Sequence, residues 1–123
     1  MKKRILIVDD DLSILECLQI ILEEAGYEVV ALSDGGNVLI KIIEANPHLV
    51  LLDIWLSGGV DGREITRKLK SGKDTQHIPV ILISALSNIE RLVKNSYADE
   101  FVAKPFELDD VLQKVGKYAP ISG

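Results

Sequence analysis

Short apolar segments recur along this chain, and a stretch of helical periodicity separates each from the next. Residues 4–8 (RILIV), 49–53 (LVLLD) and 79–84 (PVILIS) are almost uninterrupted apolar runs of strand length. Residues 27–32 (YEVVAL) and 100–104 (EFVAK) are two further strand-length runs. A continuous apolar run is typical of a strand that is covered on both faces, as in a parallel sheet. This pattern predicts a sheet buried between two layers of helices.

The segments between these runs have the period of a helix. From Leu15 to Ala25 apolar residues recur at helical spacing, and Gly26 follows as a stop signal. We expect further helices from after Gly35-Gly36 to residue 45 and over the ranges 61–69, 88–95 and 107–118. Strands that alternate with helices predict an α/β fold of the doubly wound, flavodoxin-like kind. The expected sheet has five parallel strands in the order 2-1-3-4-5, with helices on both faces.

Length and charge restrict the function of the chain. Its 123 residues suffice for one domain, expected over residues 1–119, with 120–123 as a C-terminal tail or the start of a removed linker. The net charge of −5 argues against direct contact with nucleic acid, because phosphate binding needs clustered Lys and Arg.

Cysteine usage and hydropathy predict a cytoplasmic protein with no membrane partner. The single cysteine, Cys17, cannot form an internal disulfide, and it lies near the apolar stripe of its helix, where we expect it to fill the core. The apolar run after the basic start breaks at Asp9, which is too early for a signal peptide. Asp53 interrupts the other long apolar stretch, so no membrane span is expected.

Polar side chains mark the end of each apolar run except the second. Ligands of such sheets bind beyond the carboxyl ends of the strands, at the point where the strand order reverses. With the order 2-1-3-4-5, that point lies between the first and third strands. The polar residues at the strand ends are Asp9, Asp10, Asp53, Ser84 and Lys104.

Each of these residues alone has an ordinary structural explanation. An aspartate after a strand often caps the next helix, and Asp11 fits that role best. A lone Ser84 would be a turn hydroxyl and a lone Lys104 a solvated charge. Several such residues at the same sheet edge favour a functional site instead.

Electrostatics indicates what such a site would bind. Two unit charges about 4 Å apart repel by about 4 kcal/mol at an effective dielectric constant of about 20. Asp9, Asp10 and Asp53 together would therefore consume much of the roughly 5–15 kcal/mol that stabilises a domain, unless protonation or a cation relieves them. An open site of oxygen ligands suits Mg²⁺. Together with the hydroxyl of Ser84 and the ammonium of Lys104, it would form a cage for a phosphoryl group.

The chain resembles the receiver domain of two-component response regulators over essentially its whole length, and the resemblance rests on four segments. The resemblance implies a phosphorylatable signalling switch rather than an enzyme. Asp53 would accept a phosphoryl group from the phosphohistidine of a sensor histidine kinase or a histidine phosphotransfer protein. The phosphorylated domain would control an effector domain or partner protein that the sequence does not specify. The segments are ILIVDDD (5–11), LVLLDIWL (49–56), PVILISA (79–85) and DEFVAKPF (99–106).

The resemblance also implies a metal site. Asp10 would bind Mg²⁺, or Mn²⁺ in its place, directly, and Asp9 would bind it through water. Asp53 and the backbone carbonyl of Trp55 would be the other protein ligands.

Further roles follow from the same resemblance. Lys104 would pair with Asp53 at rest and with the phosphoryl group afterwards. Ser84 would bond a phosphoryl oxygen and move inward, and Phe101 would change rotamer as the aromatic switch residue. The bond between Lys104 and Pro105 is expected to be cis.

The chain departs from the family pattern in three places. The loop after the third strand reads Ser-Gly-Gly at 57–59, lacks the usual proline and is longer before Asp61-Gly62. Two glycines raise backbone freedom, so we expect this loop to be mobile. The segment 84–104 is shorter than usual, which predicts a short helix over 88–95. Tyr97 stands where the family commonly has glycine.

Two other functions stay open at this point. A receiver-like domain that no longer uses phosphate would act as a protein-interaction module, although every chemical position here carries a competent residue. A flavodoxin-like cofactor site would need amide loops that hold phosphate and aromatic rings that stack, rather than a carboxylate cluster. The sequence does not specify the oligomeric state.

Overall fold

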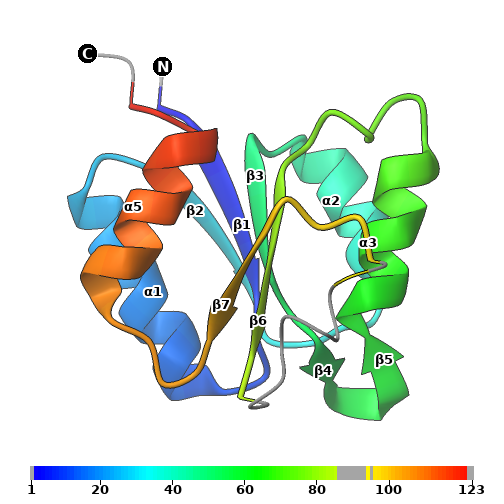
Figure 1. Ribbon diagram of the computed structural model, residues 1–123, viewed down its shortest axis with the longest axis horizontal. Coiled ribbons are helices and arrows are strands. Elements are labelled where there is room, and N and C mark those ends of the chain that lie inside the picture. The colour runs from blue at the N-terminus through cyan, green and yellow to red at the C-terminus, as the bar shows by residue number, and fades with distance from the viewer. Residues whose placement is uncertain (1, 86–93, 95, 122–123) are drawn as a thin grey trace.

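The computed structural model describes residues 2–85, 94 and 96–121, and its centre is a five-stranded parallel sheet (Figure 1). The strand order is β2-β1-β3-β6-β7, which confirms the predicted order 2-1-3-4-5. The strands of this sheet are β1 (Arg4–Val8), β2 (Glu28–Leu32), β3 (Leu49–Asp53), β6 (Val80–Ser84) and β7 (Glu100–Ala103).

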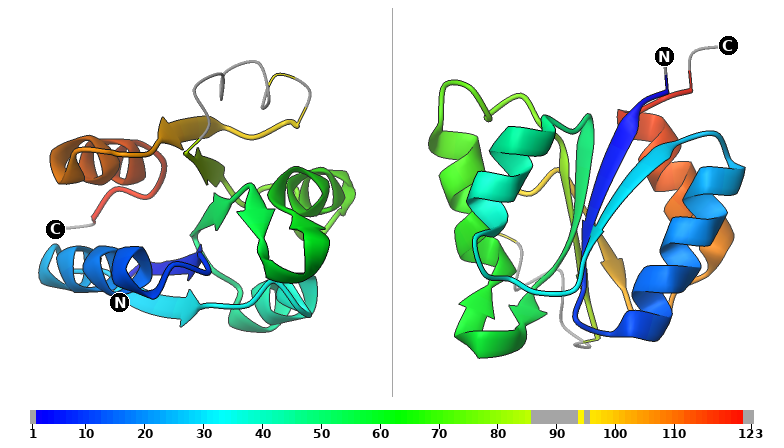
Figure 2. Two further views of the ribbon diagram at one scale, coloured as in Figure 1. Left: turned by 90° about the horizontal axis from the view of Figure 1, so that it is seen from below. Right: turned by 180° about the vertical axis from the view of Figure 1, so that it is seen from behind.

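Helices cover both faces of the sheet, as expected. The helices α1 and α5 lie on one face, and α2 and α3 lie on the other (Figure 2). The helix expected over residues 88–95 lies outside the described residues, apart from Lys94. Within the described residues the helices are α1 (Leu12–Glu24), α2 (Val38–Ala45), α3 (Gly62–Ser71) and α5 (Leu108–Tyr118).

Two apolar cores explain the continuous apolar runs in the sequence. Successive side chains of a strand point to opposite faces. In β1, Ile5 and Ile7 join the core beneath α1 and α5, whereas Leu6 and Val8 join the core beneath α2 and α3. All of these side chains are fully buried, and burying each stabilises the fold by about 1.5–3 kcal/mol. The strands β3 and β6 alternate in the same way.

Strand register brings the polar strand ends to one edge of the sheet. Val8 pairs with Leu52, so Asp9 follows β1 at the level of Asp53. Asp53 pairs with Ile83, and Ser84 pairs with Ala103, the residue before Lys104. This edge is the lower one in Figure 1.

The first helix begins as the sequence predicts. The side chain of Asp11 accepts hydrogen bonds from the backbone N–H groups of Ser13, at 3.0 Å, and Ile14, at 3.3 Å. The expectation that Cys17 fills the core is wrong, because its side chain is exposed. Each helical residue turns about 100° around the axis. Cys17, two residues after the buried Leu15, therefore lies on nearly the opposite side of the helix.

The loop after β3 forms a small antiparallel hairpin that the sequence did not predict, and its expected mobility stays a prediction. Its strands are β4 (Trp55–Leu56) and β5 (Val60–Asp61), and a short 3-10 turn, η1 (Ser57–Gly59), joins them. Gly58 and Gly59 have φ angles of 79° and 77°, which glycine adopts without strain. The two glycines thus produce a defined turn.

The described helices are short. The longest, α1, has 13 residues, and none of those in the described part of the chain combines the length and apolarity needed to cross a bilayer.

Tyr97 occupies a glycine-like backbone position, in agreement with the family pattern. Its φ angle is 66°, in the left-handed region, and its side chain is 71% exposed. A left-handed conformation costs an L-residue about 1–2 kcal/mol, and glycine avoids this cost. Glycine loses more backbone entropy on folding, which cancels part of the gain.

We therefore expect Tyr97→Gly to raise the free energy of unfolding by about 0.5–1 kcal/mol. Urea denaturation measures the change. Asn46→Gly is the matched control, because Asn46 also has a left-handed φ of 48° but asparagine tolerates this conformation. A gain no larger than that of the control would contradict the explanation.

Candidate functional site

Three carboxylates meet at the carboxyl edge of the sheet. One oxygen each from Asp9, Asp10 and Asp53 lies within 4.8 Å of the other two. Asp9 is fully buried and Asp53 is 6% exposed, whereas Asp10 is open to solvent. The structure thus brings together the acidic residues that the sequence singled out.

Lys104 neutralises part of this charge. Its Nζ lies 3.1 Å from Asp53 Oδ2 and 2.9 Å from Asp9 Oδ2. The pairing with Asp53 was expected, but the pairing with Asp9 was not. The sequence carries no signal for it, because β3 and β6 lie between β1 and β7 and the reach of the lysine chain decides the contact.

Asp9 has an unusual arrangement of contacts. Its Oδ1 accepts a hydrogen bond from the backbone N–H of Asp11 at 2.9 Å. Its Oδ2 is buried, and its partner within the described residues is the ammonium of Lys104 at 2.9 Å. A carboxylate oxygen has two lone pairs, so Oδ2 keeps capacity for a further cationic partner beside Lys104.

Both oxygens of Asp53 have partners. Oδ1 accepts from the backbone N–H of Trp55 at 3.2 Å, and Oδ2 accepts from Lys104. Burial raises the pKa of Asp53 above its usual value, the contact with Lys104 opposes this effect, and the charge of Asp9 adds to it. Each carboxylate oxygen has two lone pairs, so the side chain keeps capacity for a metal or an electrophile.

Asp10 accepts a hydrogen bond from a residue that the sequence did not single out. The hydroxyl of Ser57 donates to Asp10 Oδ2 at 2.9 Å. The only sequence signal is that Ser57 lies in the loop that departs from the family pattern. Its contact depends on the hairpin, which brings η1 over the end of β1.

Trp55 lies beside the cluster with a half-exposed ring. The guanidinium of Arg63 lies 5.0 Å from the ring centroid and also forms an ion pair with Asp61 at 2.8 Å. Burial alone would raise the pKa of Asp61, but hydrogen bonds from Arg63 outweigh it and lower that pKa. Because Trp55 pairs with Asp61 in the hairpin, these contacts fix the backbone next to Asp53.

Gly62 is a second residue that sequence reasoning missed. A Cβ atom at this position would lie 2.3 Å from the backbone oxygen of Asp53, so only glycine fits. The N–H of Gly62 also donates to the carbonyl of Ile54 at 2.7 Å. The start of α3 is therefore packed directly against the end of β3.

The remaining expected residues occupy the neighbouring strands. Ser84 is fully buried at the end of β6, and its carbonyl accepts from the N–H of Lys104 at 2.8 Å. Phe101 is half-buried against the core beneath α2 and α3. Lys114 donates to the carbonyl of Phe101 at 3.2 Å and lies 5.9 Å from its ring centroid. The bond between Lys104 and Pro105 is cis, as expected.

The model of the response regulator receiver domain matches residues 5–116 of this chain. The chain belongs to this family. Among curated relatives, the regulatory protein VanRB of Enterococcus faecalis is 38% identical over 117 residues, which cover 94% of the chain and 51% of the relative. The transcriptional regulator RpaA of Synechocystis is 36% identical over 114 residues, which cover 91% of the chain and 47% of the relative. The receiver domain thus spans about half the length of these relatives.

Solved structures support the same assignment. The response regulator TrrA of Thermotoga maritima, in complex with Mg²⁺ and BeF, matches with a TM-score of 0.84 and 36% identity. This match covers 94% of the receiver domain and 98% of TrrA.

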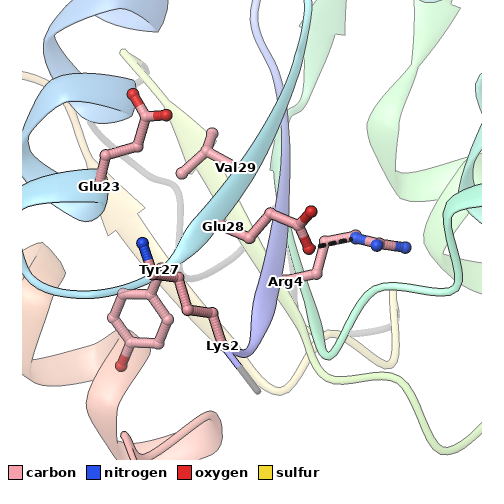
Figure 3. Close-up of a pocket in the computed structure, with 6 residues that line it drawn as sticks. All are labelled: Lys2, Arg4, Glu23, Tyr27, Glu28 and Val29. Carbon is pink, nitrogen blue, oxygen red and sulfur yellow. Dashed lines mark hydrogen bonds and ion pairs between the residues drawn. The ribbon is translucent and has the colours of Figure 1, made fainter.

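A hollow on the surface of the receiver domain lies away from the acidic cluster. This hollow of about 480 Å³ lies at the opposite, amino end of β1 and β2, where an exposed ion pair joins Arg4 and Glu28 (Figure 3). None of the residues that line this hollow belongs to the cluster of Asp9, Asp10 and Asp53.

Replacing Lys104 with methionine tests the electrostatics of the site. Without magnesium, Lys104→Met leaves Asp9 and Asp53 buried with no cation, so we expect the free energy of unfolding at pH 7 to fall by about 2–3 kcal/mol. Losing Lys104 raises the pKa of Asp53 further in the folded state. The loss of stability relative to the wild type therefore grows as the pH rises through the pKa of Asp53 in the folded variant. It becomes smaller at about pH 4, where this carboxyl is mostly protonated in the variant.

Urea denaturation at both pH values measures this dependence. Lys117→Met is the matched control, because Lys117 is largely exposed and its contact with Glu100 at 3.6 Å contributes little. A deficit that does not change with pH would contradict the electrostatic explanation.

Proposed function

We propose that this receiver domain is a phosphorylatable signalling switch with Asp53 as the phosphoryl acceptor. The observation that carries the proposal is the position of Asp53 between Lys104 and two further carboxylates. This group lies beyond the carboxyl ends of the strands, where doubly wound sheets bind their ligands.

The proposed reaction transfers a phosphoryl group from a partner's phosphohistidine. A carboxylate oxygen of Asp53 attacks phosphorus and forms an acyl phosphate. The phosphorus–nitrogen bond breaks, and its electron pair returns to the imidazole, which leaves as a neutral ring when its other nitrogen carries a proton. Lys104 and Ser84 would then bind phosphoryl oxygens, since an ammonium and a hydroxyl donate to the charge that develops there.

The residues present fit a magnesium ion. The donor set consists of three clustered carboxylates, whose oxygens are hard ligands of the kind Mg²⁺ prefers. Asp10 and Asp53 would hold the ion directly, Asp9 would hold it through water, and the carbonyl of Trp55 would complete the protein ligands. The bound ion supplies charge neutralisation for the phosphoryl oxygens. Mn²⁺ suits the same oxygen ligands.

The proposed output is a shift between two conformations. Ser84 would move toward the new phosphoryl group, and Phe101 would change rotamer with it. A ligand shifts such an equilibrium only by its differential affinity for the two states, and the contacts of the phosphoryl group with Ser84 and Lys104 would supply it.

The partners follow from the family. We propose a sensor histidine kinase or a histidine phosphotransfer protein as the donor, and a cytoplasmic location for the exchange. RpaA is named as a DNA-binding regulator and is about twice as long as the part that matches, so a DNA-binding effector is one candidate output. The expectation of no direct nucleic-acid contact rests on the net charge of −5 and concerns this chain alone.

Incubation with acetyl phosphate and magnesium tests the acceptor. We expect one phosphoryl mass to be added to the intact protein, and none in Asp53→Asn, because an amide oxygen does not form the acyl phosphate. Mass spectrometry measures both. Asp11→Asn is the control, since asparagine caps a helix as well as aspartate does.

The same experiment discriminates between the switch and an interaction module that does not use phosphate. An unmodified wild-type protein at millimolar acetyl phosphate would favour the interaction module. Modification that persists in Asp53→Asn would place the acceptor elsewhere.

Magnesium should stabilise the folded domain. At ten times its Kd, a ligand of the native state stabilises it by about 1.4 kcal/mol, which corresponds to a rise in Tm of roughly 5 °C for a domain of this size. We expect this rise in the wild type and a smaller one in Asp10→Asn. Trp55 lies beside the cluster, so its fluorescence should change in the same titration.

The control is Glu44→Gln, which makes the same change from carboxylate to amide on an exposed residue of α2 outside the cluster. Equal effects of magnesium on the Tm of the two variants would contradict the metal site.

A further inference from the structure

Ser57 and Asp10 form a contact that joins the hairpin to the acidic cluster. Both side chains are exposed, and they are 47 residues apart in the sequence. An exposed aspartate normally samples several rotamers, and fixing one of them costs entropy. The hydrogen bond from Ser57 at 2.9 Å fixes the Asp10 carboxylate beside Asp9 and Asp53.

The hairpin gives Ser57 a defined position. Leu56, the preceding residue, is 6% exposed and belongs to the core beneath α2 and α3. Leu56 pairs with Val60 across the hairpin, so both ends of the turn are held. A Cβ atom on Gly35 would lie 3.0 Å from Val60 and 3.2 Å from Leu56, which shows how closely the hairpin packs on its neighbour.

The two glycines after Ser57 form the turn, and the space around their Cα atoms is open. A Cβ atom on Gly58 or Gly59 would meet nothing within 4 Å, so their positive φ angles, rather than lack of space, are what these positions require. The extra length of this loop therefore provides a turn that presents the Ser57 hydroxyl to Asp10. A proline, which the family commonly has in this loop, has no hydroxyl to donate.

We propose that Ser57 is a positioning residue for the metal site, which holds Asp10 in the orientation that binds a divalent cation. This inference rests on the proposed magnesium site and identifies a residue that regulates its affinity. Mg²⁺ demands near-ideal octahedral geometry, so a fixed carboxylate binds it better than a freely rotating one. Hydrogen-bond partners of metal ligands commonly change metal affinity by about 10–100-fold. Because this pair is exposed, the expected effect is a threefold to tenfold change.

Isothermal titration with magnesium chloride tests the proposal. We expect Ser57→Ala to raise the Kd for Mg²⁺ about threefold to tenfold. Ser57→Thr keeps the hydroxyl and should bind nearly as the wild type does. Ser71→Ala is the matched control, because Ser71 is also exposed but its hydroxyl donates to Lys68 within α3. The Tm of each variant without metal shows that the fold is intact.

A second measurement shows whether the effect passes through Asp10. The carboxyl carbon signal of Asp10 in the NMR spectrum of the metal-free protein should move in Ser57→Ala and stay in place in Ser71→Ala. Weaker binding without this movement would overturn the positioning role, as would Ser57→Ala binding Mg²⁺ as tightly as the wild type or more tightly. Absence of binding by the wild type would overturn the magnesium site itself, together with this inference.

Discussion

The ammonium of Lys104 between the buried carboxylates of Asp9 and Asp53 is the interaction on which the site depends. Two carboxylates in a sheet edge of low polarity would repel strongly, and burial alone raises the pKa of Asp53. Lys104 contacts both, at 2.9 and 3.1 Å, and thereby joins the ends of β1, β3 and β7. Lys104 therefore provides a positive charge to both buried carboxylates at once.

Lys104 neutralises only part of the negative charge of the cluster. The charge that remains determines which ions the site attracts. The three clustered carboxylates and one ammonium leave a formal charge of −2, since 3 − 1 = 2. A divalent cation would compensate that charge, whereas a second lysine would not. A phosphoryl group brings negative charge of its own, so the proposed reaction would need the cation to be present at the same edge. The proposed dependence on magnesium thus follows from the charge count.

The sequence predicted the parts that depend on local pattern. Continuous apolar runs such as residues 49–53 identified buried parallel strands, and a parallel sheet necessarily collects its strand ends at one edge. The sequence did not predict contacts that depend on side-chain reach or loop conformation, such as those between Lys104 and Asp9 and between Ser57 and Asp10. The prediction that Cys17 fills the core was wrong for a related reason. Its position near an apolar stripe in the sequence does not specify on which side of the helix its side chain lies.

The hairpin is tied to the core, because Leu56 is buried in the core beneath α2 and α3 and Val60 packs against it. The two cores are built from side chains that alternate along β1, β3 and β6, and none of these depends on the conformation of the residues 57–59. The hairpin follows shortly after Asp53 in the chain. Gly62, which comes directly after the hairpin, packs closely against the backbone of Asp53. The turn residues 57–59 are exposed, and Ser57 among them contacts Asp10, so the conformation of the turn bears directly on the surroundings of the acidic cluster.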